Sequence, residues 1–124
     1  MALPVPAREP GPGLDKASRD RLRRGQYPID GRLDLHGLTR DRAHAAVTRF
    51  LLDGVARDWR CLLLITGKGQ KNKMGGGEVG VLKSELPRWL AEPPLRPLIL
   101  ATVSARPQHG GEGAVYLLLR RRRP

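Results

Sequence analysis

The sequence predicts a single α/β domain with a mixed four-stranded sheet and the element order β-α-β-α-β-β. Short apolar runs of strand length alternate with two stretches whose apolar residues recur at helical spacing. The last two runs are separated only by a short glycine-rich turn, which is typical of an antiparallel pair. With 124 residues, of which 40% are hydrophobic, the chain has enough aliphatic material for one modest core.

The first strand is expected at residues 33–36, in a stretch that reads LDLHG. Alternation along a strand places Asp34 and His36 on one face and the two leucines on the other. A carboxylate beside an imidazole at a strand end is either a catalytic or binding pair or a buried structural pair. This short stretch alone leaves both interpretations open.

Two helices are expected where apolar side chains recur every three or four residues. Thr39 is placed to cap the first helix, which should end near Arg57. Pro87 lies within the second and predicts a kink or a helix in two pieces. The two apolar stripes are Ala43, Val47, Phe50, Leu51 and Val55, and Val81, Leu82, Leu86, Trp89 and Leu90.

The remaining strands are expected at residues 61–65, 98–103 and 114–119. The first of these reads CLLLI, and such a continuous apolar run suits a strand covered on both faces. Helical connections imply that the first three strands run parallel, and the turn at residues 106–113 makes the last antiparallel. Three polar, glycine-rich turns then meet at one sheet edge, where ligands of open α/β sheets usually bind.

The apolar second face of the sheet needs a cover. The candidates are a second copy of the chain or residues 14–29, through Leu22, Tyr27 and Ile29, and we favour the N-terminal segment. The expected parts of the chain are an extension at 1–30 (a flexible tail, then a short basic helix), the domain at 31–120 and a basic tail at 121–124.

Lys and Arg number 23 against 12 acidic residues, for a net charge of +11. This excess favours an anionic partner, most commonly nucleic acid, although a basic surface also aids solubility. Aromatic residues are only 4%, which argues against a base-stacking platform. A single cysteine, Cys61, excludes an internal disulfide and a cysteine-based zinc site. Without a long apolar run or leader, we expect a cytoplasmic protein with no membrane partner.

The glycine turn at Gly67 lacks the spacing of the phosphate-binding P-loop, and Asn72 stands where a dinucleotide fingerprint needs glycine. We therefore expect no nucleotide cofactor. Taken together, LDLHG, the TGKG that begins at Thr66 and the GGEGA before the last strand resemble, in order and spacing, the Smr (small MutS-related) domain family. The frame around LDLHG is similar to stand-alone bacterial members with a short N-terminal extension.

The resemblance implies a two-layer fold similar to the C-terminal domain of a bacterial translation initiation factor. Its sheet order would be 1-2-4-3, with both helices on one face. It also implies nucleic-acid binding, with endonuclease activity on DNA or RNA in several members. The family often has His-Gly-x-Gly at the second motif, where this chain has Thr66. A threonine does not serve as an acid or base near neutral pH, so a second histidine would have to come from His109.

We therefore predict an endonuclease that cuts phosphodiester bonds in RNA or structured DNA. His36 would move the proton, Asp34 would orient it or hold a divalent metal such as Mg or Mn, and Lys68 would stabilise phosphate charge with the N–H groups of Gly67 and Gly69. The residues expected along the nucleic acid are Gly37, Thr66, Gly67, Gly69, Lys71, Lys73, Arg106, His109, Gly110, Gly111, Gly113 and Arg120–Arg123.

Two alternative functions are compatible with the same excess of positive charge. One is a module that binds nucleic acid or ribosome-associated RNA without cutting it, and the other is a protein-interaction domain whose charge is incidental. The salt dependence of partner affinity distinguishes these two alternatives, because phosphate contacts predict a steep fall in affinity as salt rises, whereas an incidental charge predicts almost no change. The chain is expected to be a monomer or a weak homodimer.

Overall fold

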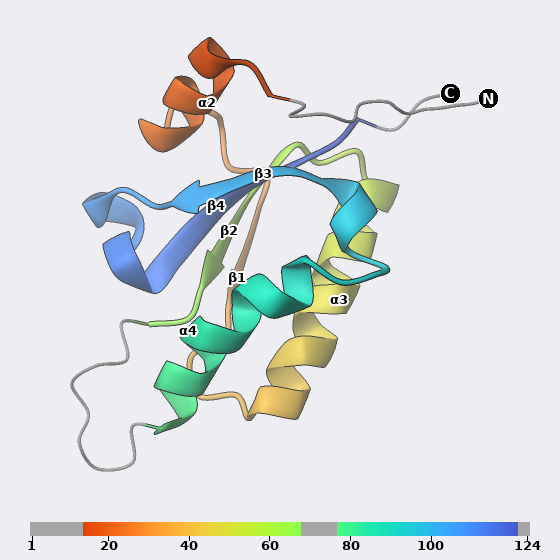
Figure 1. Ribbon diagram of the computed structural model, residues 1–124, viewed down its shortest axis with the longest axis vertical. Coiled ribbons are helices and arrows are strands. Elements are labelled where there is room, and N and C mark those ends of the chain that lie inside the picture. The colour runs from red at the N-terminus through yellow and green to blue at the C-terminus, as the bar shows by residue number, and fades with distance from the viewer. Residues whose placement is uncertain (1–13, 68–76, 122–124) are drawn as a thin grey trace.

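The computed structural model describes residues 14–67 and 77–121 (Figure 1). Its α-helices are α2 (Lys16–Arg23), α3 (Arg40–Ala56) and α4 (Gly77–Leu90), and its strands are β1 (Gly31–Asp34), β2 (Cys61–Ile65), β3 (Ile99–Ser104) and β4 (Ala114–Leu119). Short 3-10 turns, η1 (Arg96–Leu98), η2 (Pro107–His109) and η3 (Gly111–Gly113), flank β3 and β4. No helix in this described part is long and apolar enough to cross a membrane.

The four strands form one sheet in the order β1-β2-β4-β3. β1 pairs parallel with β2, whereas β4 is antiparallel to both of its neighbours. Strands β1, β2 and β3 therefore all run in one direction, as the helical connections predict. The α/β class, the element order and the strand order are all confirmed.

One face of the sheet is covered by α3 and α4 (Figure 1). Thr39 begins α3, because its side chain accepts a hydrogen bond from the N–H of Arg42 at 3.3 Å. The core on this face includes Leu35, Val47, Leu51, Leu62, Leu64, Leu82, Leu86, Trp89 and Leu117, and Leu33 packs against it. Both leucines of LDLHG thus face the helices.

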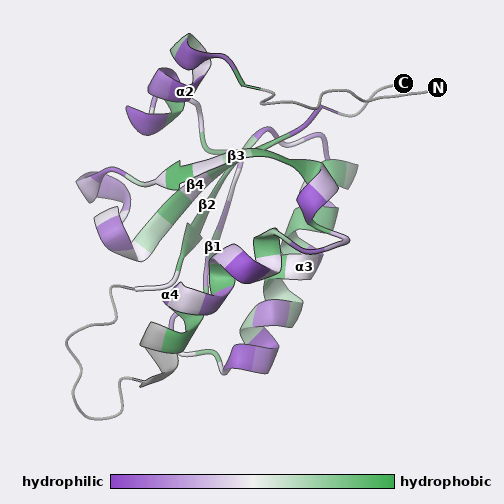
Figure 2. Ribbon diagram, in the orientation of Figure 1, coloured by the Kyte–Doolittle hydropathy of each residue, from purple (hydrophilic) through white to green (hydrophobic). Residues whose placement is uncertain are grey.

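The second face is covered by the N-terminal segment, as predicted. Leu22 of α2 is 1% exposed and packs in a cluster to which Tyr27 and Ile29 add their side chains. The sheet contributes Cys61, Leu63, Ala101, Ala114, Tyr116 and Leu118 to this cluster. Figure 2 shows the consequence, a largely hydrophobic sheet beneath a mostly hydrophilic α2 ribbon. Burying two apolar faces lets a continuous run such as CLLLI sit in the middle of the sheet.

Three details differ from the prediction. β1 spans Gly31–Asp34 rather than residues 33–36, and it ends early because the Asp34 carboxylate accepts the N–H of His36 and the chain turns there. β3 begins and ends one residue later than residues 98–103. α4 is a single helix that includes Pro87, so the expected helix in two pieces is wrong. Pro87 lies in the last turn, and the buried Leu86 and Trp89 hold that turn against the core.

Candidate functional site

The ends of β1 and β2 and the start of β4 meet at one sheet edge. Ile65 is paired with Asp34 on one side and with Ala114 on the other. Beyond the strands, the N–H of Leu35 donates to the carbonyl of Ile65 at 2.8 Å, and the N–H of Thr66 donates to the carbonyl of Gly113 at 2.8 Å. The LDLHG turn, the TG turn and the glycine turn before β4 are therefore adjacent, as the sequence predicts.

Asp34 and His36 are both exposed at this edge. Asp34 is in register with Ile65, whose side chain belongs to the cluster beneath α2, so Asp34 lies on that face of the sheet. Its Oδ1 accepts the backbone N–H of His36 at 2.9 Å. The carboxylate thus sets the backbone turn that presents the imidazole, and Gly37 follows with φ of +88°.

His109 makes the shortest polar contact near the site. Its Nδ1 lies 2.6 Å from the hydroxyl of Tyr116, which also accepts the backbone N–H of Arg106 at 3.2 Å. A hydroxyl can donate one hydrogen bond and accept two, so the Tyr116 oxygen takes the Arg106 N–H and bonds Nδ1 either as donor or as acceptor, according to the tautomer of the ring. In both cases the half-buried ring of His109 is held by a fully buried tyrosine.

The backbone N–H groups of the glycine turn are bonded within the protein. Gly110 and Gly111 have φ of +116° and +52°, which glycine adopts without strain. The N–H of Gly110, of Gly111 and of Gly113 donate to the carbonyls of Pro107, Arg106 and Gly110. These glycines shape the turn, and their amides are already paired rather than open to an anion.

Two of the predicted site residues, Gly67 and Thr66, have hydrogen-bond partners within the protein. The N–H of Gly67 donates to the carbonyl of Gly113 at 3.0 Å, so it is not directed at a phosphate. Thr66 is 3% exposed, and its hydroxyl donates to the carbonyls of Gly67 and Gly113 at 3.1 and 3.4 Å. The Thr66 side chain thus connects two turns through the carbonyl of the buried Gly113.

The basic residues predicted to follow the nucleic acid are not all together. Arg106 is exposed at the glycine turn, near His109. Arg120 and Arg121 follow the far end of β4, where the N–H of Arg120 donates to the carbonyl of Leu98, so they lie at the opposite end of the sheet from Asp34. Lys68, Gly69, Lys71 and Lys73, and Arg122 and Arg123 of the tail, lie outside the described residues.

A metal ion at this site would rely on Asp34. Within residues 14–67 and 77–121, no group of three or more His, Cys, Asp or Glu side chains is arranged to hold a metal ion. Asp34 therefore has no preformed set of partner ligands in the described part of the chain. A divalent ion held there would take its remaining ligands from water and from substrate phosphates, as Mg²⁺ commonly does.

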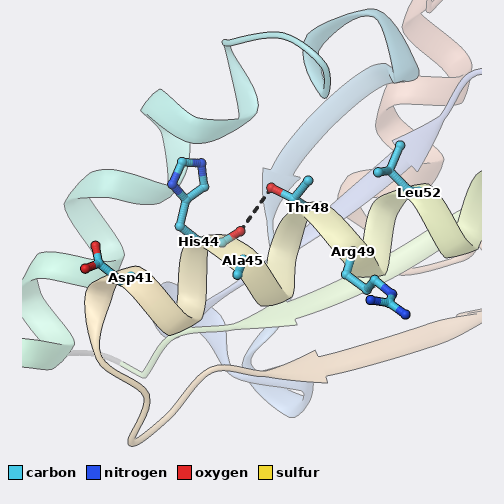
Figure 3. A pocket seen from close by; sticks show the side chains of 6 residues that line it. All are labelled: Asp41, His44, Ala45, Thr48, Arg49 and Leu52. Atoms are coloured by element: carbon cyan, nitrogen blue, oxygen red, sulfur yellow. Dashed lines mark hydrogen bonds between the residues drawn. The ribbon is translucent and has the colours of Figure 1, made fainter.

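An open hollow on the outer side of α3 lies away from this edge (Figure 3). It is lined only by residues of that helix, namely Asp41, His44, Ala45, Thr48, Arg49 and Leu52. The imidazole of His44 stacks on Trp89 of α4, with ring centroids 4.6 Å apart and ring planes 2° from parallel. This hollow is on the helical layer, whereas Asp34 faces the opposite side of the sheet.

Sequence reasoning missed Tyr116, the residue that orients His109. The signal was present, because Tyr116 is the single polar side chain in the strand AVYLLL. A buried tyrosine hydroxyl needs a hydrogen-bond partner, and the polar turn directly before the strand is the nearest source of one.

Comparison with known proteins identifies the family. The sequence pattern of the Smr domain matches residues 33–120. The chain is 33% identical over 109 residues to "Probable DNA endonuclease SmrA" of Escherichia coli, covering 88% of this chain and 55% of that protein. It is 31% identical over 119 residues to "Ribosome rescue factor SmrB" of Shewanella oneidensis, covering 94% and 61%. The chain thus spans less than two thirds of the length of these curated relatives.

Comparison of the fold with solved structures identifies the same family. YdaL, a stand-alone small MutS-related protein from Escherichia coli, has a crystal structure that superposes with a TM-score of 0.72. The match has 33% sequence identity and covers 88% of this chain and 79% of YdaL. From the sequence match across residues 33–120 and the shared fold, the chain belongs to the Smr domain family.

Proposed function

We propose that this chain binds nucleic acid and acts as an endonuclease, with Asp34 and His36 at its centre. One observation carries the proposal: both side chains are exposed at the edge where three turns meet, on a turn that Asp34 itself holds. Relatives named as a DNA endonuclease and as a ribosome rescue factor support the same class of substrate. RNA and structured DNA are the substrates that we test.

The chemistry follows from the two side chains. His36 accepts the proton of the attacking hydroxyl or water, or gives a proton to the leaving oxygen, because an imidazole ring can act as a general base or a general acid. Asp34 positions His36 through the backbone and offers its carboxylate to a divalent metal such as Mg or Mn. Lys68 is proposed to neutralise the charge that develops on the phosphate.

Binding without cleavage is the second candidate, and two observations favour it. Thr66 stands at the position of the histidine that the second motif often has, and its hydroxyl is buried and bonded to backbone carbonyls. Asp34 accepts a backbone N–H, so its carboxylate holds a turn even without catalysis. In this case the same edge would hold RNA or DNA for a larger assembly.

A cleavage and binding assay on labelled RNA and DNA separates these functions. The variants are His36→Ala and Asp34→Asn, since asparagine keeps an oxygen that can accept the His36 N–H while removing the charge. Asp53→Asn on α3 is the matched control, an exposed carboxylate on the helical layer. We expect both site variants to lose cleavage by at least about a hundredfold, the usual contribution of general acid–base catalysis, while the control cuts normally.

Each result has a clear meaning. Cleavage that survives both substitutions overturns the active-site assignment, and binding with no cleavage by the wild-type protein selects the second candidate. Loss of wild-type cleavage in EDTA assigns a metal to the reaction. Absence of wild-type binding to either nucleic acid overturns both functions. We also propose a cytoplasmic monomer or weak homodimer, which sedimentation of the protein checks for its oligomeric state.

A further inference from the structure

Helix α2 is the most basic element in the described chain. Residues 15–24 carry five cations (Lys16, Arg19, Arg21, Arg23 and Arg24) and two acids (Asp15 and Asp20), a net charge of +3 over ten residues. α3 has a net charge of +1 over its 17 residues. α2 buries only Leu22, so nearly all of this charge stays on its outer surface, which Figure 2 shows as hydrophilic.

The C-terminal end of α2 lies directly on the glycine turn. Gly25 ends the helix with φ of +71°, and a Cβ atom at that position would be 2.7 Å from the hydroxyl of Tyr116. The same Cβ would be 3.3 Å from Cγ of Arg106. Arg24 is therefore next in the chain to a residue that touches both Tyr116 and Arg106, and Tyr116 in turn bonds His109.

This end of α2 is on the same face of the sheet as Asp34. Asp34 is in register with Ile65, and Ile65 with Ala114 at the start of β4, so only β2 separates β1 from β4. Two strand spacings amount to about 10 Å. One nucleic-acid strand can therefore pass Asp34 and His36, cross the glycine turn and reach α2 without leaving this face.

The arginines at the end of α2 also have a purely structural explanation. Cations near a helix C-terminus are favoured by the helix dipole, and Arg23 forms an ion pair with Asp20 at 3.5 Å. However, the Arg23 side chain is 59% exposed, and exposed pairs of this kind contribute little. A phosphate can therefore replace Asp20 as the partner of Arg23. The helix dipole favours Arg24 at this position without forming a direct bond to its guanidinium group.

We propose that Arg23 and Arg24, together with Arg106, form a second phosphate-binding surface for the strand that enters the Asp34–His36 edge. The occupant is the sugar–phosphate backbone of nucleic acid, which the net charge of α2 and the guanidinium groups suit. The inference rests on the proposed nucleic-acid binding and extends it. α2 then both covers the sheet and extends the nucleic-acid-binding surface beyond the motifs at the edge.

Salt dependence of binding tests this surface directly. The affinity for a short labelled single-stranded RNA and a short labelled DNA duplex is measured over a range of salt for wild type and for R23Q/R24Q. The matched control is R42Q/R49Q on α3, which also removes one ion-paired arginine (Arg49 with Asp53, 3.8 Å) and one other exposed arginine. R23K/R24K keeps the charge, and circular dichroism shows whether each variant retains its helices.

Two lost phosphate contacts flatten the slope of log affinity against log salt by about 1.4 on a single strand or about 1.8 on a duplex. We expect this for R23Q/R24Q, with wild-type slopes for R42Q/R49Q and R23K/R24K. An unchanged slope in R23Q/R24Q, or equal flattening in R42Q/R49Q, overturns the second surface while leaving nucleic-acid binding intact. If wild type binds neither probe, the proposed function itself fails, and this surface with it.

Discussion

Replacing Tyr116 with phenylalanine removes one oxygen from the centre of the second face. That oxygen accepts the N–H of Arg106 at 3.2 Å and lies 2.6 Å from Nδ1 of His109. The ring itself is fully buried and keeps its packing in the variant. The substitution therefore isolates two hydrogen bonds that connect the glycine turn to the sheet.

The expected loss follows from these two bonds. Each contributes about 0.5–1.5 kcal/mol net, so the free energy of unfolding should fall by about 1–3 kcal/mol. For a domain of this size a loss of 1 kcal/mol lowers Tm by roughly 4 °C. The backbone N–H of Arg106 is left without its acceptor, which favours the upper part of this range.

Urea unfolding of wild type and Tyr116→Phe measures the difference. Tyr27→Phe is the matched control, because Tyr27 lies in the same cluster and, within residues 14–67 and 77–121, its hydroxyl has no hydrogen-bond partner. We expect the control to change the free energy by less than about 0.5 kcal/mol. Equal losses in both variants would refute the hydrogen-bond argument, as would a Tyr116→Phe protein as stable as wild type.

Nitrogen NMR of the His109 ring gives an independent measure. In wild type the bond to Tyr116 should hold the ring in one tautomer, because Nδ1 then either accepts the hydroxyl proton or donates its own. In Tyr116→Phe this constraint is gone, and Nδ1 should show the mixture of tautomers found for a solvated ring. A wild-type ring with the same mixture of tautomers as Tyr116→Phe would contradict the bond between His109 and Tyr116.

Two further substitutions have defined outcomes. Thr39→Ala should lower the free energy of unfolding by about 1 kcal/mol, because the Arg42 N–H loses its cap, whereas Thr48→Ala within the same helix should cost less; equal costs would contradict the capping role. Burial, and then the charge of Asp30, raise the pKa of the Cys61 thiol to about 11 from a usual value near 9. Stability from this group is therefore complete below about pH 9 and lost as pH rises to 11, by about 2–3 kcal/mol. Alkaline unfolding of wild type and Cys61→Ala measures it, and identical pH profiles would refute it.

The strand directions and the meeting of three turns could be predicted from the sequence, because both follow from local patterns joined by general rules. The strand order was predicted only from the resemblance to the Smr family. Alternation in LDLHG and the continuous run CLLLI identify strands, and the helices between strands make them parallel. The cover of the second face was also predictable, since CLLLI and AVYLLL are too apolar for either face to remain open. The apolar residues Leu22, Tyr27 and Ile29 were the nearest available cover in the chain.

The finer geometry of the site depends on contacts between distant residues. The early end of β1 comes from a side chain bonding to its own backbone two residues later, which competes with the strand and leaves no periodic signal. The bond between Tyr116 and His109 depends on where the turn folds back over β4. The pairing of the amides in the glycine turn could not be predicted either. A glycine pattern alone does not distinguish a turn whose amides are bonded within the protein from a site that binds an anion.

Because the N-terminal segment covers the second face, the family pattern and the folded domain have different boundaries. The family pattern begins at residue 33, after α2, Tyr27 and Ile29. A chain cut to the pattern would contain every motif at the edge, yet it would present the side chains of Leu63, Tyr116 and Leu118 to water. The segment that carries the family motifs is thus shorter than the segment that is needed to bury both faces of the sheet. A fragment of this chain that begins at residue 33 would therefore need another segment or a partner to cover that face.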